Sequence, residues 1–270
     1  MGKIVSVWSQ GRKSGRTVFL YNLASHMAEK LDEKFKILVC CANLAQGNLM
    51  HLFNIPENEL NLEDIVNFKI TSGGDINIFE AMARRDNVYF TGSRKTGGTY
   101  AARNISAYEE LLRDFKGKFD LILIDILAGK ENILTNMILQ KSDFVLNVLC
   151  QDRESLDGSM FKTEKDLAYV VNYYRDIYPD TRDLNSLYKL DKPIFTLPPC
   201  DQLQEMKNKD KLALYRQHET KYNSSLKEIT AFMAESLSLQ LDAEPVGTGK
   251  KKGFLKSVIV NMLGEAYEQH

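Results

Sequence analysis

The sequence lacks the long apolar segments that mark membrane-spanning and secreted proteins. No apolar run approaches the roughly 20 residues that cross a bilayer. The apolar stretch near the N-terminus is interrupted by Gln10, Arg12 and Lys13, which is too early for the core of a secretory signal. We therefore expect a cytoplasmic protein.

Cysteine is scarce and is not spaced like a set of metal ligands. The cysteines lie inside or at the ends of apolar, strand-like runs, at Cys40, Cys41, Cys150 and Cys200. This pattern is typical of small buried thiols in a reducing compartment.

The chain also lacks an excess of either charge. Its formal net charge of −1 gives no overall attraction to nucleic acid, so we expect no sequence-specific nucleic-acid partner. Apolar residues make up 44% and charged residues 26%, which is ordinary globular usage and favours neither disorder nor a fibrous repeat. A length of 270 residues fits one α/β domain with a tail.

Short apolar runs alternate with longer stretches of helical period. Thr17–Lys30, for example, places Leu20, Leu23 and Met27 on one helical face. The runs that predict strands are Ile4–Trp8, Ile37–Cys41, Val88–Thr91, Leu121–Asp125, Phe144–Leu149, Tyr169–Asn172 and Ile194–Leu197. Strands that alternate with helices predict a doubly wound, mostly parallel α/β sheet with helices on both faces. We assign residues 1–241 to this domain, 242–249 to a linker and 250–270 to a distinct final segment.

The loop after the first predicted strand is placed to bind phosphate. It reads Ser9-Gln10-Gly11-Arg12-Lys13-Ser14-Gly15-Arg16-Thr17 and leads directly into a helix, whose N-terminus would aim N–H groups at a phosphate chain. A phosphate loop written GxxxxGK[ST] is met at Gly15 and Thr17, whereas Gln10 and Arg16 depart from it. Arg16 would still bring positive charge to phosphate oxygens, and Thr17 would place its hydroxyl on Mg²⁺. The alternative is an ordinary basic turn with Thr17 at the helix start.

Two later segments make the case more specific. The run from Ile37 to Leu49 reads as an apolar strand followed by Gln46-Gly47-Asn48, and the run from Phe119 to Gly129 reads as an apolar strand that ends at Asp125 and is followed by Gly129. A carboxylate at the end of that strand would hold a Mg²⁺-bound water. The structural alternative is a buried aspartate that caps the next loop.

In their order and spacing these segments resemble the MinD/ParA family of P-loop ATPases, the deviant Walker A branch of the SIMIBI class. Further matches are Val88 to Arg94 for the third strand, Ser142 to Leu156 for a later strand and its loop, and Leu197 to Asp201 for a late strand and turn. Among relatives the chain is most similar to the TadZ/CpaE branch, which also tolerates irregular phosphate loops.

The resemblance implies a nucleotide site at the carboxyl ends of the strands. It implies ATP or ADP with Mg²⁺ as cofactor, metal contacts from Thr17 and Asp125, and a homodimer. The residues that we predict to contact the nucleotide are Gly11, Arg12, Lys13, Ser14, Gly15, Arg16, Thr17, Asn172, Pro199 and Asp201.

The sequence departs from the family where the chemistry is done. The family's first loop lysine falls on Gly11, its second on Arg16, and its two aspartates after the second strand fall on Cys41 and Asn43. Phosphoryl transfer depends on positioning and charge stabilisation, so these losses predict weak or absent hydrolysis. We assign no catalytic residue, and Asp125 is the one candidate.

The final segment has the pattern of a helix that lies in a membrane surface. Lysines precede an apolar stripe at helical spacing, and Lys-Lys-Gly-Phe-Leu-Lys resembles the MinD membrane-targeting tail. The residues that we predict to contact an anionic inner-membrane surface are Lys251, Lys252, Phe254, Leu255, Val258, Ile259, Met262 and Leu263. The alternative is a terminal helix packed on its own domain or on a second copy.

These features favour a degenerate ATPase that positions or scaffolds a bacterial pilus, secretion, flagellar or division machine at the membrane, in contact with protein components of that machine. The first alternative is a working ATP-hydrolysing switch of the same family. The second is a relative of the bacterial tyrosine kinases, which usually end in a tyrosine cluster, whereas only Tyr267 stands near this terminus.

Overall fold

In the part of the chain that the structure describes, eight strands form one sheet in the order β3-β4-β2-β5-β1-β6-β7-β8. The computed structural model describes residues 1–43, 52, 61–72, 82–93, 98–152, 156, 162–212, 215 and 218–239. The predicted linker at 242–249, the predicted helix at 250–270 and the segment Gln46-Gly47-Asn48 lie outside these residues. Strand bounds are β1 Lys3–Trp8, β2 Ile37–Cys41, β3 Ala83–Arg85, β4 Val88–Gly92, β5 Leu121–Asp125, β6 Phe144–Leu149, β7 Asp166–Asn172 and β8 Ile194–Leu197.

The predicted doubly wound α/β sheet is confirmed. Neighbouring strands pair in parallel throughout, except that β3 pairs antiparallel with β4 at the edge. Each of the seven predicted strands is present, within three residues of its predicted ends. The sequence analysis missed β3, which is three residues long and carries two arginines.

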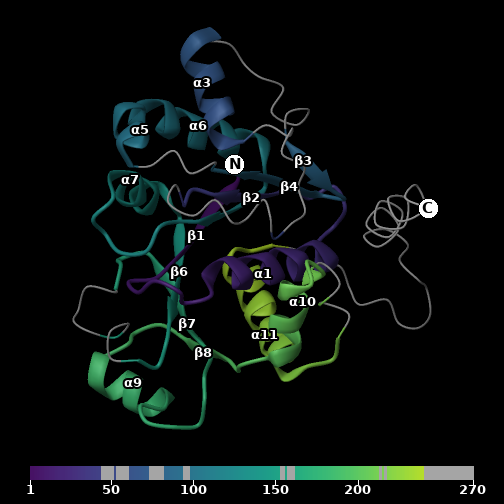
Figure 1. The fold of residues 1–270 in the computed structure, drawn as a ribbon, viewed down its shortest axis with the longest axis vertical. Coiled ribbons are helices and arrows are strands. Elements are labelled where there is room, and N and C mark those ends of the chain that lie inside the picture. Colours follow the sequence, from purple (N-terminus) through teal and green to yellow (C-terminus); the bar gives the residue numbers. More distant parts are fainter. Residues whose placement is uncertain are drawn as a thin grey trace.

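Helices cover both faces of the sheet (Figure 1). On one face lie α1 (Arg16–Lys30), α10 (Asp201–Asn208) and α11 (Lys221–Ser236), and on the other lie α3 (Leu62–Ser72), α5 (Gly98–Arg103), α6 (Ile105–Lys118) and α7 (Ile133–Lys141). The helix α9 (Thr181–Tyr188) packs Leu184 against side chains of β7. Two large apolar cores result, one on each face.

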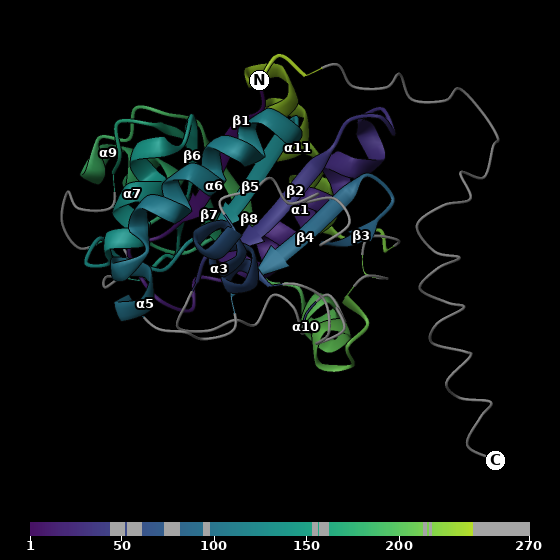
Figure 2. The ribbon, with the colours of Figure 1, turned by 90° about the horizontal axis from the view of Figure 1, so that it is seen from above.

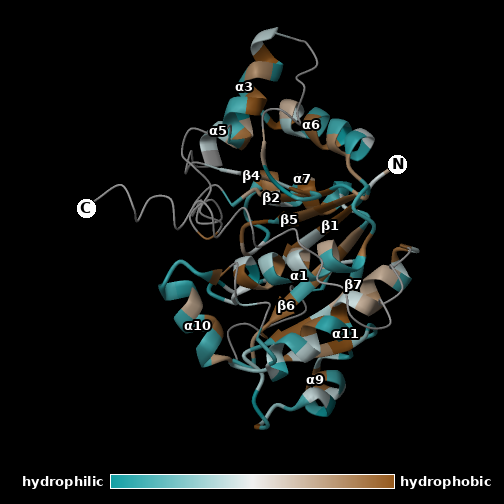
Figure 3. Ribbon diagram, turned by 90° about the vertical axis from the view of Figure 1, so that its right-hand side faces the viewer, coloured by the Kyte–Doolittle hydropathy of each residue, from teal (hydrophilic) through white to brown (hydrophobic). Residues whose placement is uncertain are grey.

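The strands are apolar because a parallel sheet covered on both faces has no solvent side. All residues of β2, β4 and β5 are buried. Figure 3 shows the central strands largely in brown between helices that carry teal on their outer surfaces. No helix among the described residues is long and apolar enough to cross a membrane.

The strand β1 lies at the centre of the sheet, between β5 and β6. The chain leaves β1 through α1 to reach β2 on one side, and later returns to β6 on the other. Figure 2, seen from above, shows β2 and β4 running side by side in the same direction. In such sheets ligands bind outside the carboxyl ends of the strands where the order reverses, which is the place occupied by the loop from Ser9 to Gly15.

The core beneath α6 predicts a large difference between two identical substitutions. Phe115 is fully buried and stacks edge-on against Phe119 at 6.0 Å, whereas Phe68 on α3 is 43% exposed. We expect Phe115→Ala to lower the free energy of unfolding by about 3–5 kcal/mol, and Phe68→Ala by less than about 1 kcal/mol. Urea unfolding followed by the fluorescence of Trp8, the sole tryptophan, measures both. Equal losses would contradict this packing.

Candidate functional site

The loop between β1 and α1 turns through glycine at the start of the helix. Gly15 is the N-cap of α1 with φ +76°, and no side chain caps the helix. A Cβ at this position would lie 2.3 Å from Nδ2 of Asn172 and 2.7 Å from the hydroxyl of Tyr173. Both the left-handed backbone and the close approach of β7 therefore require glycine. The N–H groups of the first helical turn remain available to an anion.

Beneath this turn, α1 and β5 meet through a buried carboxylate. Asp125 is fully buried, and its Oδ2 accepts a hydrogen bond of 2.5 Å from the hydroxyl of Thr17. Its Oδ1 lies 3.8 Å from Nε of Arg16, which is an ion pair too long to be a hydrogen bond. The predicted Asp125 therefore points toward the loop, as the fold requires.

Burial dominates the charge states of this pair. Burial lowers the pKa of the Arg16 guanidinium, while the charge of Asp125 raises it. Burial likewise raises the pKa of Asp125, while Arg16 and the hydrogen bond from Thr17 lower it. The last residue of β2 offers the thiol of Cys41, 3.9 Å from Asp125, and the loop after it offers the amide of Asn43. Neither is a carboxylate that could orient a water for attack.

Three contacts join the end of β1 and the start of the loop that follows it to the loop after β5. The indole N–H of Trp8 donates to the carbonyl of Gly129, and the N–H of Gly129 donates to the carbonyl of Ser9, each at 3.1 Å. The ammonium of Lys130 lies 5.2 Å above the Trp8 ring. The loops after β1 and β5 are therefore coupled, and the fluorescence of Trp8 reports on both.

Asn172 ties the loop to the end of β7. Its Nδ2 donates to the carbonyl of Ser14 at 2.8 Å, and its Oδ1 accepts from the N–H of Tyr173. A cavity of about 190 Å³ lies beside it, between α1, β8 and α10, and its lining includes Gly15, Pro199 and Asp201. Four of the predicted nucleotide contacts, Gly15, Asn172, Pro199 and Asp201, thus lie around one cavity; their contact with a nucleotide stays a prediction.

A larger basic cavity of about 690 Å³ lies on the other side of the loop. Its lining includes the side chains of Arg12, Lys13 and Arg175. Within the described residues none of these three cations is engaged in an ion pair. Unpaired cations around one cavity attract an anion.

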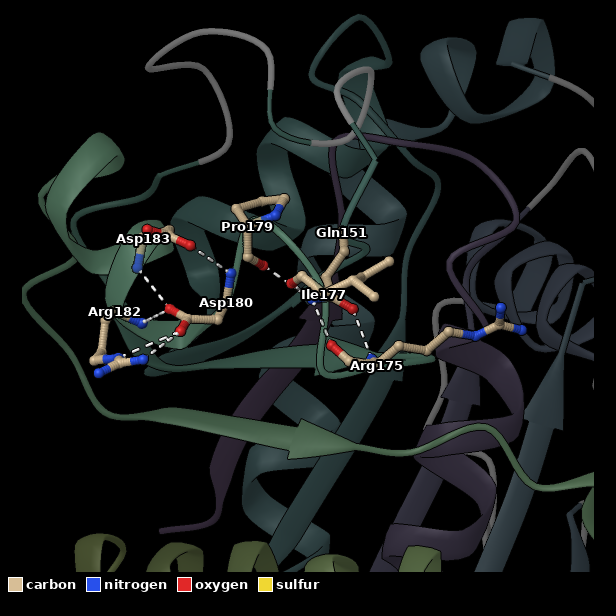
Figure 4. Close-up of polar contacts among 7 residues, drawn as sticks. All are labelled: Gln151, Arg175, Ile177, Pro179, Asp180, Arg182 and Asp183. Atoms are coloured by element: carbon tan, nitrogen blue, oxygen red, sulfur yellow. Dashed lines mark hydrogen bonds and ion pairs between the residues drawn. The ribbon is translucent and has the colours of Figure 1, made fainter.

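The turn that carries Arg175 is held by a single glutamine. The Gln151 amide donates to the carbonyls of Arg175 and Pro179, each at 2.9 Å, and to that of Ile177 at 3.3 Å. Its carbonyl accepts a bond of 2.7 Å from the N–H of Arg175. Figure 4 shows Gln151 inside the turn and the Arg175 side chain extending away from it, with α9 starting at the capping box of Asp180 and Asp183.

The sequence analysis missed Gln151, Tyr173 and Arg175. Each owes its place to the tertiary fold: Gln151 bonds backbone groups of a distant loop, and Tyr173 adopts φ +58° beside Gly15. No motif marks these residues. No cluster of three or more metal-binding side chains occurs in the described ranges.

The sequence matches no protein-family model and no curated protein sequence. Solved structures do match. The septum site-determining protein MinD from Pyrococcus horikoshii, complexed with Mg-ADP, has a TM-score of 0.69 at 19% identity, covering 87% of this chain and 97% of that one. A ParA family ATPase from Chlorobium tepidum gives 0.71 at 14% identity, over 85% and 98%. MinD in the MinC:MinD complex of Aquifex aeolicus gives 0.68 at 14% identity, over 92% and 99%.

These similarities extend over nearly the whole of each relative. The chain therefore has the fold of the MinD and ParA ATPases, a P-loop α/β fold, as the sequence predicted. The nearer resemblance to the TadZ/CpaE branch stays a prediction.

The geometry at Gly15 predicts the effect of adding one methyl group. We expect Gly15→Ala to destabilise the fold by about 1–3 kcal/mol, because alanine disfavours a positive φ and its Cβ would strike Asn172. Gly117→Ala is the matched control, since nothing lies within 4 Å of a Cβ there and alanine favours the helix by about 0.5–1 kcal/mol. Thermal unfolding of both variants measures these changes in stability. A Gly15→Ala variant as stable as the wild type would be inconsistent with this turn.

Proposed function

We propose that this protein is a positioning or scaffolding protein of MinD/ParA type that binds ATP or ADP, hydrolyses it weakly or not at all, and associates with the inner face of the cell membrane. The observation that carries the proposal is the buried contact of Thr17 with Asp125 beneath α1, combined with Cys41 at the end of β2 and Asn43 after it. The first keeps the framework of a phosphate site, and the second lacks its water-orienting acid.

The residues around the loop fit a nucleotide. Nη1 of Arg16 is buried and has no hydrogen-bond partner within the described residues, so a phosphate oxygen would satisfy it. The uncapped N-terminus of α1 adds N–H donors and the positive end of a helix dipole. Arg12, Lys13 and Arg175 add charge at the rim, and the cavity beside Pro199 and Asp201 would hold the base.

Weak hydrolysis follows from what surrounds the phosphate position. A thiol and an amide replace the carboxylates of the family after β2, and the cation of the loop is an arginine already paired with Asp125. Catalysis of phosphoryl transfer requires several such groups to act together. A protein that keeps its nucleotide bound stays in one conformation, which suits a scaffold that presents a fixed surface to its protein partners.

A role in positioning is supported by the relatives and by the final segment. The relative from Pyrococcus horikoshii is named a septum site-determining protein, and the one from Aquifex aeolicus was solved in complex with MinC. By analogy we propose a homodimer that contacts protein components of a localised bacterial machine of pilus, secretion, flagellar or division type. The lysines and the apolar stripe of 250–270 supply the membrane contact.

Nucleotide binding is tested by titrating ADP and following Trp8 fluorescence and binding heat. We expect Arg175→Gln to weaken binding about threefold to tenfold, because it removes an unpaired cation beside the phosphate loop. Arg182→Gln is the matched control: the charge change is the same, but Arg182 is exposed on α9 and bonds only Asp180 among the described residues. Equal effects would remove Arg175 from the site, and no binding by the wild type would overturn the proposal.

Turnover separates this proposal from a working switch. We expect steady-state ATP hydrolysis at least about 100-fold slower than that of a ParA-type ATPase measured in parallel, since losing one stabilising donor alone costs about this much. Phosphate release under saturating ATP measures it. Turnover equal to the reference would identify an active ATPase instead.

Membrane association is tested by flotation with vesicles that contain anionic lipid. We expect the full chain to float and a chain truncated after Gly249 to stay in the soluble fraction, because the basic and apolar residues lie beyond that point. Lys251→Glu with Lys252→Glu in the full chain should also abolish flotation. Flotation of the truncated chain to the same extent would remove the membrane from the proposal.

A further inference from the structure

The end of β5 carries a carboxylate with one oxygen hydrogen-bonded to a hydroxyl and the other facing a guanidinium without a hydrogen bond. Asp125 is fully buried. Its Oδ2 accepts from the hydroxyl of Thr17 at 2.5 Å, and its Oδ1 faces the guanidinium of Arg16 at 3.8 Å. The negative charge at this point of the site is therefore balanced from within the chain.

Arg16 has one more donor than the protein uses. The residue is only 7% exposed, and its Nη1 lies buried with no hydrogen-bond partner in the part of the chain that the structure describes. A guanidinium donates through five N–H groups in a fixed plane, so one edge can face Asp125 while another faces a phosphate oxygen. A buried cationic donor without an acceptor is costly, and an anionic oxygen removes that cost.

The N-terminus of α1 faces the same space. The helix runs 15 residues from Arg16, and its N-cap Gly15 contributes no side-chain hydrogen bond. The unpaired N–H groups of the first turn and the helix dipole favour negative charge there. A phosphate at this point would meet the backbone N–H groups and the Arg16 guanidinium together.

A magnesium ion does not fit the same donors. Mg²⁺ requires nearly octahedral oxygen ligands at about 2.0–2.1 Å and keeps several waters. The two residues that the sequence predicted as metal contacts, Thr17 directly and Asp125 through a bound water, are hydrogen-bonded to each other at 2.5 Å, so Oδ2 of Asp125 already has a partner. A divalent ion placed beside them would also stand next to the charge of Arg16, which repels it.

We infer that Arg16 takes the place of the divalent cation, so that the site binds a nucleoside di- or triphosphate without Mg²⁺. The inference rests on the proposed nucleotide binding and adds which cation neutralises the phosphates. Arg16 neutralises the phosphate and Asp125 at once, and Thr17 holds Asp125 in place. The nucleotide then serves as a ligand whose retention does not depend on the metal.

The test is calorimetric titration of the full chain with ADP, in excess EDTA and in excess MgCl₂. For the wild type we expect ADP to bind no more tightly in MgCl₂ than in EDTA, because Mg²⁺ binds free ADP and competes for it with a site that takes ADP without the metal. We expect Arg16→Lys to bind ADP at least about tenfold more tightly with Mg²⁺ than with EDTA. The compact ammonium of lysine does not span from the phosphate to Asp125 as the guanidinium does, so the carboxylate is left open to the ion. Arg182→Lys, the same exchange at an exposed position of α9 outside the site, should behave like the wild type.

A second measurement needs no variant. Mn²⁺ added to the wild-type protein with ADP should keep the electron paramagnetic resonance signal of Mn-ADP in solution, with no protein-bound fraction. Bound Mn²⁺, or wild-type affinity that rises about tenfold with Mg²⁺, would overturn the inference and leave nucleotide binding intact. Absence of ADP binding in both buffers, by protein whose circular dichroism is native, would instead overturn the proposed nucleotide binding itself.

Discussion

The site depends on a carboxylate buried at the end of β5. Asp125 joins that strand to the first turn of α1 through Thr17 and Arg16, so the position of the helix N-terminus and the position of the charge are set together. A buried ion pair contributes little net stability, but removing one partner from such a pair typically costs about 3–5 kcal/mol. The contact therefore fixes one arrangement of the site more than it strengthens the fold.

Two amide side chains fix the rest of the site around this contact. Asn172 holds the loop carbonyl of Ser14, and Gln151 holds the turn that carries Arg175. Both amides bond backbone atoms, so the loops that approach a ligand have their shape before it arrives. Binding to a preformed site avoids the entropy cost of ordering those loops.

The sequence predicted the sheet well because parallel strands that are buried on both faces consist of continuous apolar runs. It also predicted that Thr17 and Asp125 would belong to one site, and the structure brings them together because the carboxyl ends of β1 and β5 share one edge of the sheet. It did not predict that Arg16 would be buried and paired with Asp125, because a basic residue in a loop is usually solvated. The role of Gln151 could not be predicted for a related reason. Its partners are backbone atoms of a distant turn, and every residue type carries the same backbone atoms.

The short strand β3 has a consequence for how copies of this protein would meet. Among the described residues it is the edge strand of the sheet. It has three residues, pairs antiparallel with β4, and carries Arg84 and Arg85, of which Arg84 lies over the ring of Tyr89 at 5.1 Å. Short edge strands with charged side chains resist pairing with a strand of another molecule. Pairing of this edge with the edge strand of a second copy, which would extend the sheet across both molecules, is therefore disfavoured.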